Sequence, residues 1–173
     1  MKKVLAVVLL LALSLTALLS CEKKNKYEDV TYREDGLYFV LPNTMRRKDA
    51  SDYEFYFSNE LLNLIFMAKK ITNEVLADME IDPGVTAKEY VDIIMQRRDF
   101  DKSKIYYTYD EERNHYNFRY SYDDEENLAT FFYVTVTGSS DNLWYIEMCC
   151  TEEESAEYLP TFENWRKSIG TYS

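Results

Sequence analysis

Histidine, cysteine, glycine and proline are all scarce in this chain of 173 residues. It contains one histidine, three cysteines, four glycines and three prolines. Any mechanism that needs a histidine base must use His115, which follows a predicted turn containing Glu111, Glu112 and Asn114. We expect that turn to be solvated and His115 to have no catalytic role. A phosphate-binding glycine loop and a zinc-binding helix motif are also missing, so the sequence predicts a protein that is not an enzyme and needs no cofactor.

The cysteines do not suggest a disulfide-stapled domain. Cys149 and Cys150 are adjacent, and neighbouring Cα atoms lie about 3.8 Å apart, below the roughly 4.4 to 6.8 Å of a usual disulfide. A strand would also point the two side chains to opposite faces. No third or fourth soft ligand accompanies them, so we expect two reduced thiols and no metal site.

Basic residues are outnumbered, with 20 Lys and Arg against 31 Asp and Glu and a net charge of −11. Nucleic acid is therefore not an expected partner, because phosphate binding requires a basic stripe. Two acidic stretches, Asp99–Asp101 and Asp123–Asn127, offer oxygen ligands of the kind that calcium prefers. Both lack the glycine and spacing of an EF-hand loop. We expect them to serve solubility, with calcium binding as the alternative.

The one long apolar run, residues 4–19, lies at the start of the chain, behind Lys2 and Lys3. It is shorter than the roughly 20 residues of a membrane-spanning helix. A basic start, a short apolar run and a cysteine just after a small residue are typical of a bacterial lipoprotein signal. We predict that residues 1–20 are a signal peptide and that Cys21 is lipidated. A secretory signal or an uncleaved anchor remains the alternative.

Lipidation would fix the location of the mature protein. One acyl chain binds a membrane only marginally, but two or three hold it stably, since each buried methylene contributes about 0.8 kcal/mol. We therefore expect a protein outside the cytoplasm, anchored by fatty acids such as palmitate to a bacterial membrane. Residues 21–35 would form the lipidated cysteine and a polar tether, and residues 36–173 are long enough for one domain.

Alternating apolar residues and chain breakers predict an antiparallel sheet. Residues 37–41 form a strand between Gly36 and Pro42, and residues 53–58 and 61–67 form a hairpin. The pattern assigns no element to residues 72–81. Period-two alternation then predicts four more strands, joined by short, turn-rich connections that suit hairpins. These strands are centred on residues 105–109, 116–122, 132–136 and 144–148.

Two helices are predicted from their first turns. Thr86 with Glu89 forms a capping box, in which each side chain satisfies a free backbone N–H, at the start of a helix over residues 87–98. Its buried stripe would contain Tyr90, Val91, Ile94 and Met95.

The second capping box pairs Thr151 with Glu154 and starts a terminal helix. We expect Pro160 to kink or split this helix and Gly170 to end it as a glycine cap. Its buried stripe would contain Tyr158, Phe162, Trp165 and Ile169.

These elements predict an α+β domain, an antiparallel sheet of six or seven strands covered by helices. The segment Gly36–Pro42, with Phe162, Trp165, Ser168 and Ile169 near the end, resembles the PsbP/DcrB-like superfamily of small extracytoplasmic domains over residues 32–170. Residues 44–46 depart from that family, which often has a tryptophan shortly after the first proline. The resemblance implies a PsbP-like α/β/α sandwich, a role in assembly or binding, and no catalytic residues.

Sixteen tyrosines are the other unusual feature. Aromatic rings with polar tips suit both sugar stacking and protein interfaces. We expect Tyr107, Tyr116 and Tyr120 to be packing residues. The leading hypothesis is a non-enzymatic interaction or assembly module with a protein partner, and the alternative is a small-ligand or carbohydrate-binding lipoprotein with an aromatic pocket. Four tyrosines on the opposite strand face are candidate ligand-binding residues: Tyr38, Tyr56, Tyr106 and Tyr145.

Overall fold

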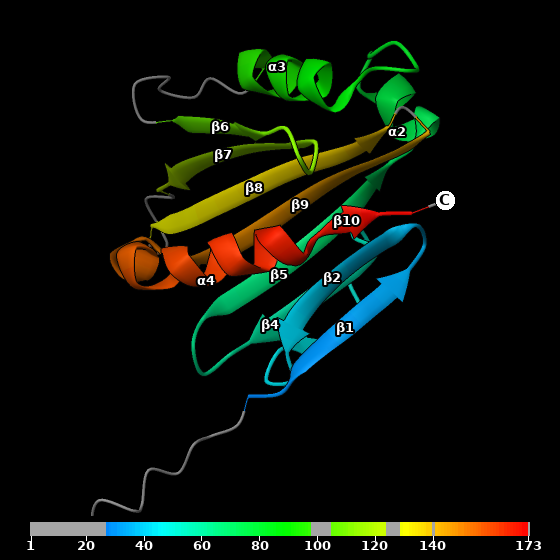
Figure 1. The fold of residues 1–173 in the computed structure, drawn as a ribbon. Coiled ribbons are helices and arrows are strands. Elements are labelled where there is room, and N and C mark those ends of the chain that lie inside the picture. Colours follow the sequence, from blue (N-terminus) through cyan, green and yellow to red (C-terminus); the bar gives the residue numbers. More distant parts are fainter. Residues whose placement is uncertain (1–26, 98–104, 124–128, 140, 173) are drawn as a thin grey trace, which may run out of the picture.

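A seven-stranded antiparallel sheet forms the centre of the molecule (Figure 1). The computed structural model describes residues 27–97, 105–123, 129–139 and 141–172. The strands of this sheet are β3 (Arg46–Arg47), β4 (Phe55–Asn59), β5 (Leu64–Ile71), β6 (Tyr106–Asp110), β7 (His115–Tyr122), β8 (Thr130–Ser139) and β9 (Asn142–Thr151). Their order across the sheet is β3-β4-β5-β9-β8-β7-β6, so β9 is central and β6 is an edge.

The predicted hairpins account for most of this order. β4 pairs with β5, β6 with β7, β7 with β8 and β8 with β9, each antiparallel. β5 then joins β9 with Met67 opposite Glu147. The β4–β5 turn is longer than expected, because Leu61 and Leu62 lie in it at 95% and 37% exposure. Asn63, at φ 48°, has a left-handed backbone that asparagine tolerates.

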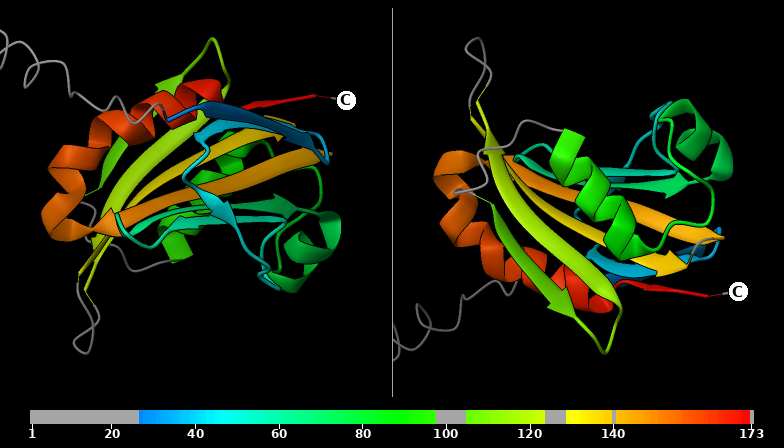
Figure 2. Two further views of the ribbon diagram at one scale, coloured as in Figure 1. Left: turned by 90° about the horizontal axis from the view of Figure 1, so that it is seen from below. Right: turned by 90° about the horizontal axis from the view of Figure 1, so that it is seen from above.

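One face of the sheet is covered by a helix and a second, smaller sheet (Figure 2). The helix α4 (Ser155–Ser168) follows a 3₁₀ turn, η2 (Glu152–Glu154). The small sheet contains β1 (Asp29–Glu34), β2 (Leu37–Pro42) and β10 (Gly170–Thr171), in the order β1-β2-β10. Together with the large sheet they enclose an aromatic core that includes Leu37, Phe39, Phe55, Phe57, Phe66, Trp144, Phe162 and Trp165.

The strand β1 corrects the predicted tether. Residues 29–34 were assigned to a polar linker, yet they pair with β2 along their whole length. Tyr32 explains the difference, because its ring stacks on Phe39 at 5.3 Å and meets Phe57 edge-on at 4.6 Å. Aromatic pairs of this kind add to the stabilisation from burial. The folded region therefore begins by Asp29.

The helix α4 differs from its prediction at both ends. The Thr151 hydroxyl donates to the Glu154 carboxylate at 2.6 Å, but neither side chain caps the backbone of η2 or α4. The helix runs through Pro160 without division. Gly170 is no cap, because Ile169 already has extended geometry (φ −72°, ψ 139°) and Gly170 belongs to β10.

The opposite face of the large sheet carries α2 (Asn73–Asp78) and α3 (Ala87–Arg97). The capping box of α3 is confirmed: the Glu89 N–H donates to the Thr86 hydroxyl at 3.2 Å, and the Thr86 N–H donates to the Glu89 carboxylate at 2.8 Å. A second core lies beneath, including Ile71, Leu76, Tyr90, Val91, Ile94, Phe118, Val134, Val136 and Leu143. No helix in the described part of the chain is long and apolar enough to cross a membrane.

Candidate binding sites on the two faces of the sheet

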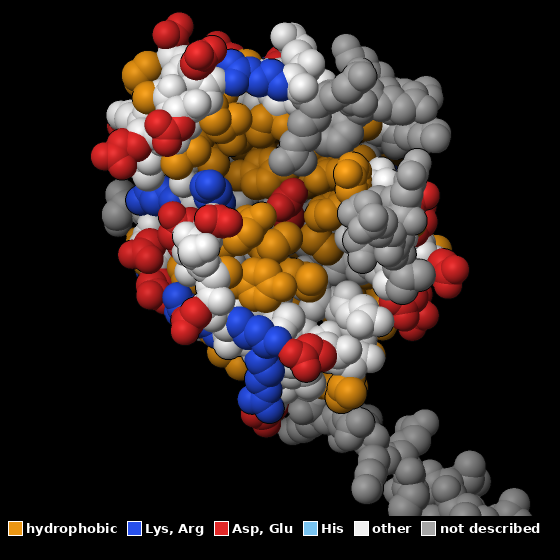
Figure 3. Space-filling view, turned by 180° about the vertical axis from the view of Figure 1, so that it is seen from behind, with side chains coloured by type: hydrophobic (Ala, Val, Ile, Leu, Met, Phe, Trp, Pro, Cys, Tyr) orange, Lys and Arg blue, Asp and Glu red, His pale blue; other side chains and the backbone are white. Residues whose placement is uncertain are grey.

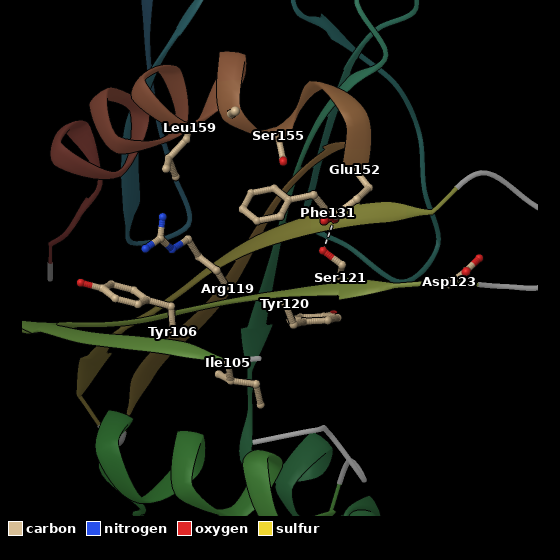
Figure 4. Close-up of a pocket in the computed structure, with 11 residues that line it drawn as sticks. Ile105, Tyr106, Arg119, Tyr120, Ser121, Asp123, Phe131, Glu152, Ser155 and Leu159 are labelled. Carbon is tan, nitrogen blue, oxygen red and sulfur yellow. Dashed lines mark hydrogen bonds between the residues drawn. The ribbon is translucent and has the colours of Figure 1, made fainter. Parts of the chain in front are cut away.

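A groove of about 780 Å³ lies between the start of α4 and the strands β6, β7 and β8. Figure 4 shows side chains from the sheet and from α4 facing each other across it. Phe131 and Leu159 provide apolar walls, and polar groups lie between them. The full lining is Ile105, Tyr106, Arg119, Tyr120, Ser121, Asp123, Phe131, Glu152, Ser155, Ala156 and Leu159.

Arg119 is the positive group of this groove. It is half-buried on β7, and in Figure 4 it extends from the sheet toward α4 beside Tyr106. Its guanidinium carbon lies 4.2 Å from the centre of the Tyr106 ring, a cation–π contact. Among the described residues no carboxylate forms an ion pair with Arg119. A planar guanidinium held by stacking alone keeps its hydrogen-bond donors available for a ligand.

The other end of the groove is acidic. The Ser121 hydroxyl donates to the exposed carboxylate of Glu152, and Asp123 lies at the same end. Arg119 and Ser121 are two positions apart on β7, which places them on one face about 7 Å from each other. The groove therefore offers separated positive and negative groups between apolar walls.

The strand β6 borders this groove and is an edge of the large sheet. Tyr106, Tyr107 and Tyr109 are exposed by 58%, 42% and 43%. The expectation that Tyr107 is a packing residue is therefore wrong, whereas Tyr120 is buried as predicted. β6 contains no lysine or proline, two residues with which proteins commonly block pairing at an edge strand.

A smaller pocket of about 240 Å³ lies on the opposite face of the large sheet, beside α2 and α3. Figure 3 shows a hollow of hydrophobic side chains with an acidic side chain in its floor. Among the described residues that line the pocket, Glu147 is the only acid. It projects from β9, the central strand, and is only 5% exposed. Three tyrosine hydroxyls donate to its carboxylate: Tyr145 at 2.9 Å, and Tyr53 and Tyr120 at 3.4 Å each.

The four tyrosines proposed as ligand-binding residues do not converge. Tyr38 points outward from β2 in the small sheet at 40% exposure, and Tyr106 lies in the groove. Tyr145 is buried on the opposite face beside Glu147, and Tyr56 is half-buried on β4. A single site built from all four is excluded by this arrangement, whereas ligand binding at individual tyrosines stays a prediction.

Sequence reasoning missed both Arg119 and Glu147. Glu147 had a signal, since it interrupts the apolar run of residues 143–150, where both strand faces are buried. A charged residue in such a run is almost never fully buried without a partner. Arg119 had no comparable signal, because an arginine within an alternating strand usually faces solvent.

His115 is buried, which corrects the expectation of a solvated turn. Its exposure is 0%, and both Arg166 of α4 and the backbone of Ile169, just after that helix, lie near the ring. Neither ring nitrogen has a hydrogen-bond partner in the described part of the chain, although the Ile169 backbone lies close to the ring. Burial, helped by the nearby Arg166 charge and partly opposed by Asp110, lowers the pKa of His115 to about 4.

Arg166 fixes α4 against the β6–β7 hairpin. Its guanidinium donates to Asp110 at 2.7 Å and to Glu163 at 3.2 Å, with the Arg166 side chain 10% exposed. The hydrogen bond from Arg166 lowers the pKa of Asp110. Tyr133 donates to Glu163 at 3.0 Å and completes the network.

The thiols of Cys149 and Cys150 are free and buried. Burial raises the pKa of Cys149 well above its usual value and that of Cys150 to about 12, so both are poor nucleophiles at neutral pH. The described ranges contain no cluster of three or more His, Cys, Asp or Glu suited to a metal ion. The acidic stretches considered for calcium, residues 99–101 and 123–127, lie outside those ranges except for Asp123.

The architecture is that of a PsbP-like α+β domain. The cyanobacterial PsbP protein (CyanoP) of Synechocystis has a similar structure, with a TM-score of 0.53 and 16% identity over 88% of this chain and 98% of CyanoP. LpqN of Mycobacterium tuberculosis, described as involved in cell envelope biogenesis, matches with a TM-score of 0.44 and 10% identity over 87% of this chain and 94% of LpqN. No protein-family model and no curated protein sequence matches this chain.

Proposed function

We propose that this chain is a lipid-anchored extracytoplasmic lipoprotein that acts as a non-enzymatic module and binds a protein partner in the groove beside α4. The observation that carries the proposal is Arg119, a half-buried guanidinium stacked on Tyr106 without a carboxylate partner among the described residues. A carboxylate from a partner would supply the missing ion pair. Hydrogen bonds to charged groups contribute about 1.5 to 3 kcal/mol when they form away from water.

The surroundings of Arg119 suit a protein partner. Tyrosine and arginine are enriched among the residues that dominate binding energy at interfaces. The adjacent edge strand β6 offers unpaired backbone groups and three exposed tyrosine rings. A partner segment could extend the sheet at β6 through main-chain hydrogen bonds while an acidic side chain reaches Arg119.

The anchor sets where such a partner is found. The predicted lipidation at Cys21 and the start of β1 at Asp29 leave residues 22–28 as the linker. Such a linker reaches about 25 Å when fully extended, which holds the domain close to its membrane. The proposed partner is therefore a protein in or near the same membrane.

Photo-crosslinking in living cells tests the proposal. A photoreactive amino acid at Ala156, an exposed lining residue of the groove, should capture a partner that mass spectrometry can identify. The same amino acid at Leu61, in the β4–β5 turn, is the matched exposed control. Arg119→Gln should reduce the crosslink at Ala156 by about tenfold or more. Cys21→Ala should release the protein from the membrane fraction and remove the crosslink.

Four outcomes would contradict the proposal. A crosslink that survives Arg119→Gln would remove Arg119 from the interface. Equal capture at Leu61 and Ala156 would show that the groove has no specificity. Recovery of the chain without any partner would favour the alternative of a small-ligand-binding lipoprotein, and a Cys21→Ala protein that stays membrane-bound would refute the lipid anchor.

A further inference from the structure

Glu147 occupies a position where a carboxylate is costly. It lies on the central strand β9, between β5 and β8, and is 5% exposed. Removing a carboxylate from water costs several kcal/mol unless opposite charge and hydrogen bonds compensate. Three tyrosine hydroxyls from separate parts of the chain converge on it, but these are neutral dipoles, and no described residue forms an ion pair with its carboxylate.

A positive charge lines the same pocket but remains apart from Glu147. Lys69 is opposite Tyr145 in the β5–β9 ladder, while Glu147 is opposite Met67, so the two charged residues are diagonal neighbours on one face. Such neighbours are within reach of long side chains. Lys69 nevertheless forms no ion pair or hydrogen bond with any residue that the structure describes.

Arg97, the other cation among the described residues that line the pocket, is already engaged. Its guanidinium donates to the carbonyl oxygens of Met79 and Glu80, and so ties the end of α3 to the end of α2. Among the described residues that line it, the pocket is therefore left with one buried acid and one half-buried base. These two groups are separated in a common cavity of about 240 Å³.

The remaining wall is apolar and aromatic. Tyr90 and Tyr145 meet edge-on, with ring centres 6.4 Å apart. Small-molecule sites are typically concave and mostly apolar, with a few polar groups that fix orientation, and this cavity is smaller than those that hold drug-sized ligands. Its aliphatic lining residues are Ile71, Val75, Met79 and Ile94.

We infer that this pocket binds a small zwitterion of the α-amino acid type with a short apolar side chain. The ligand's ammonium group lies against Glu147, where it supplies the missing counter-charge, and its carboxylate lies against Lys69. The side chain contacts the aliphatic wall formed with α2 and α3. This site is on the opposite face from the groove and does not depend on the proposed function.

Calorimetric titration with three matched probes tests this inference. L-leucine carries both charges, 3-methylbutylamine has the same skeleton without the carboxylate, and 4-methylpentanoate lacks the ammonium. Leucine should bind the purified domain at millimolar or lower concentration, and each single-charge probe should bind at least about tenfold more weakly. Absence of leucine binding overturns the inference, as does equal binding of leucine and either single-charge probe.

Substitutions then assign the binding to this pocket. Glu147→Gln keeps the shape and an acceptor but removes the charge, and Lys69→Met keeps the stem but removes the ammonium. Each should weaken leucine binding by about tenfold or more. Lys70→Met is the matched control, because Lys70 is the next residue of β5 and packs over Trp144 on the opposite face. If Glu147→Gln does not fold, Lys69→Met alone decides, and leucine affinity unchanged by Lys69→Met refutes the site.

Discussion

His115 should make the stability of this domain depend on pH in a way that one substitution removes. The ring is buried and its pKa is lowered from 6.5 to about 4. Between these values the unfolded chain binds a proton at His115 and the folded chain does not. Unfolding therefore takes up a proton, and the free energy of unfolding decreases as the pH falls from about 6.5 to about 4.

The size of this effect follows from the shift. A difference of one pKa unit corresponds to about 1.4 kcal/mol, so the shift to about 4 corresponds to about 3 kcal/mol of stability at neutral pH that is absent at pH 4. His115 is the only histidine in the chain, so no other imidazole contributes. Leucine has a similar volume and no charge. His115→Leu should also remove two buried nitrogens without hydrogen-bond partners among the described residues.

Urea denaturation at pH 7.5, 6.5, 5.5 and 4.5 provides the measurement. The free energy of unfolding of the wild type should decrease over this range by about 2 to 3 kcal/mol more than that of His115→Leu. Carboxylates titrate in both proteins, so the comparison largely cancels them. Parallel pH profiles for the two proteins would refute the argument, because they would show that His115 is protonated in the folded state or accessible to water.

Two further substitutions test the packing of α4 and β10. Asp110→Asn removes the charged partner of Arg166 and should lower the free energy of unfolding by about 2 kcal/mol at pH 7, whereas Glu34→Gln in the exposed pair with Arg47 should cost less than about 1 kcal/mol. Because the pKa of Asp110 is lowered in the folded state, the loss of unfolding free energy caused by Asp110→Asn should shrink below about pH 4. Equal losses for Asp110→Asn and Glu34→Gln at pH 7 would contradict the network. Gly170→Ala would place a Cβ 2.2 Å from the Tyr38 ring and should lower the free energy of unfolding by about 1 to 3 kcal/mol. If this contact is the cause, the same substitution in a Tyr38→Ala background should cause no loss.

The sequence predicted the strands whose periodicity reflects burial. β6 to β9 and the β4–β5 hairpin were identified because their residues alternate or are continuously apolar. β1 was missed because only two of its six residues (DVTYRE), Val30 and Tyr32, have partly buried side chains. Its stability comes from Tyr32 packing on Phe39 and Phe57, and such a contact between distant segments leaves no local pattern.

The candidate sites were harder to predict for the same physical reason. His115 was assigned to a solvated turn from its acidic neighbours, yet its burial depends on α4, which begins 40 positions later in the chain. Gly170 looked like a helix cap, whereas its role is to allow close approach to Tyr38. The Glu147 and Lys69 pocket depends on the register between β5 and β9, which residue spacing within either strand does not specify.

The small sheet has a consequence for the order in which the chain can fold. The Val40 N–H donates to the Ser168 hydroxyl at 2.9 Å across a separation of 128 positions, and β10 pairs with β2. A chain that emerges from a membrane with its N-terminus first thus presents the apolar face of β2 long before α4 and β10 can cover it. Contacts of such long range slow folding and leave hydrophobic surface open to aggregation. In the export proposed above, the β1–β2 hairpin therefore needs protection from aggregation until residues 155–171 have crossed.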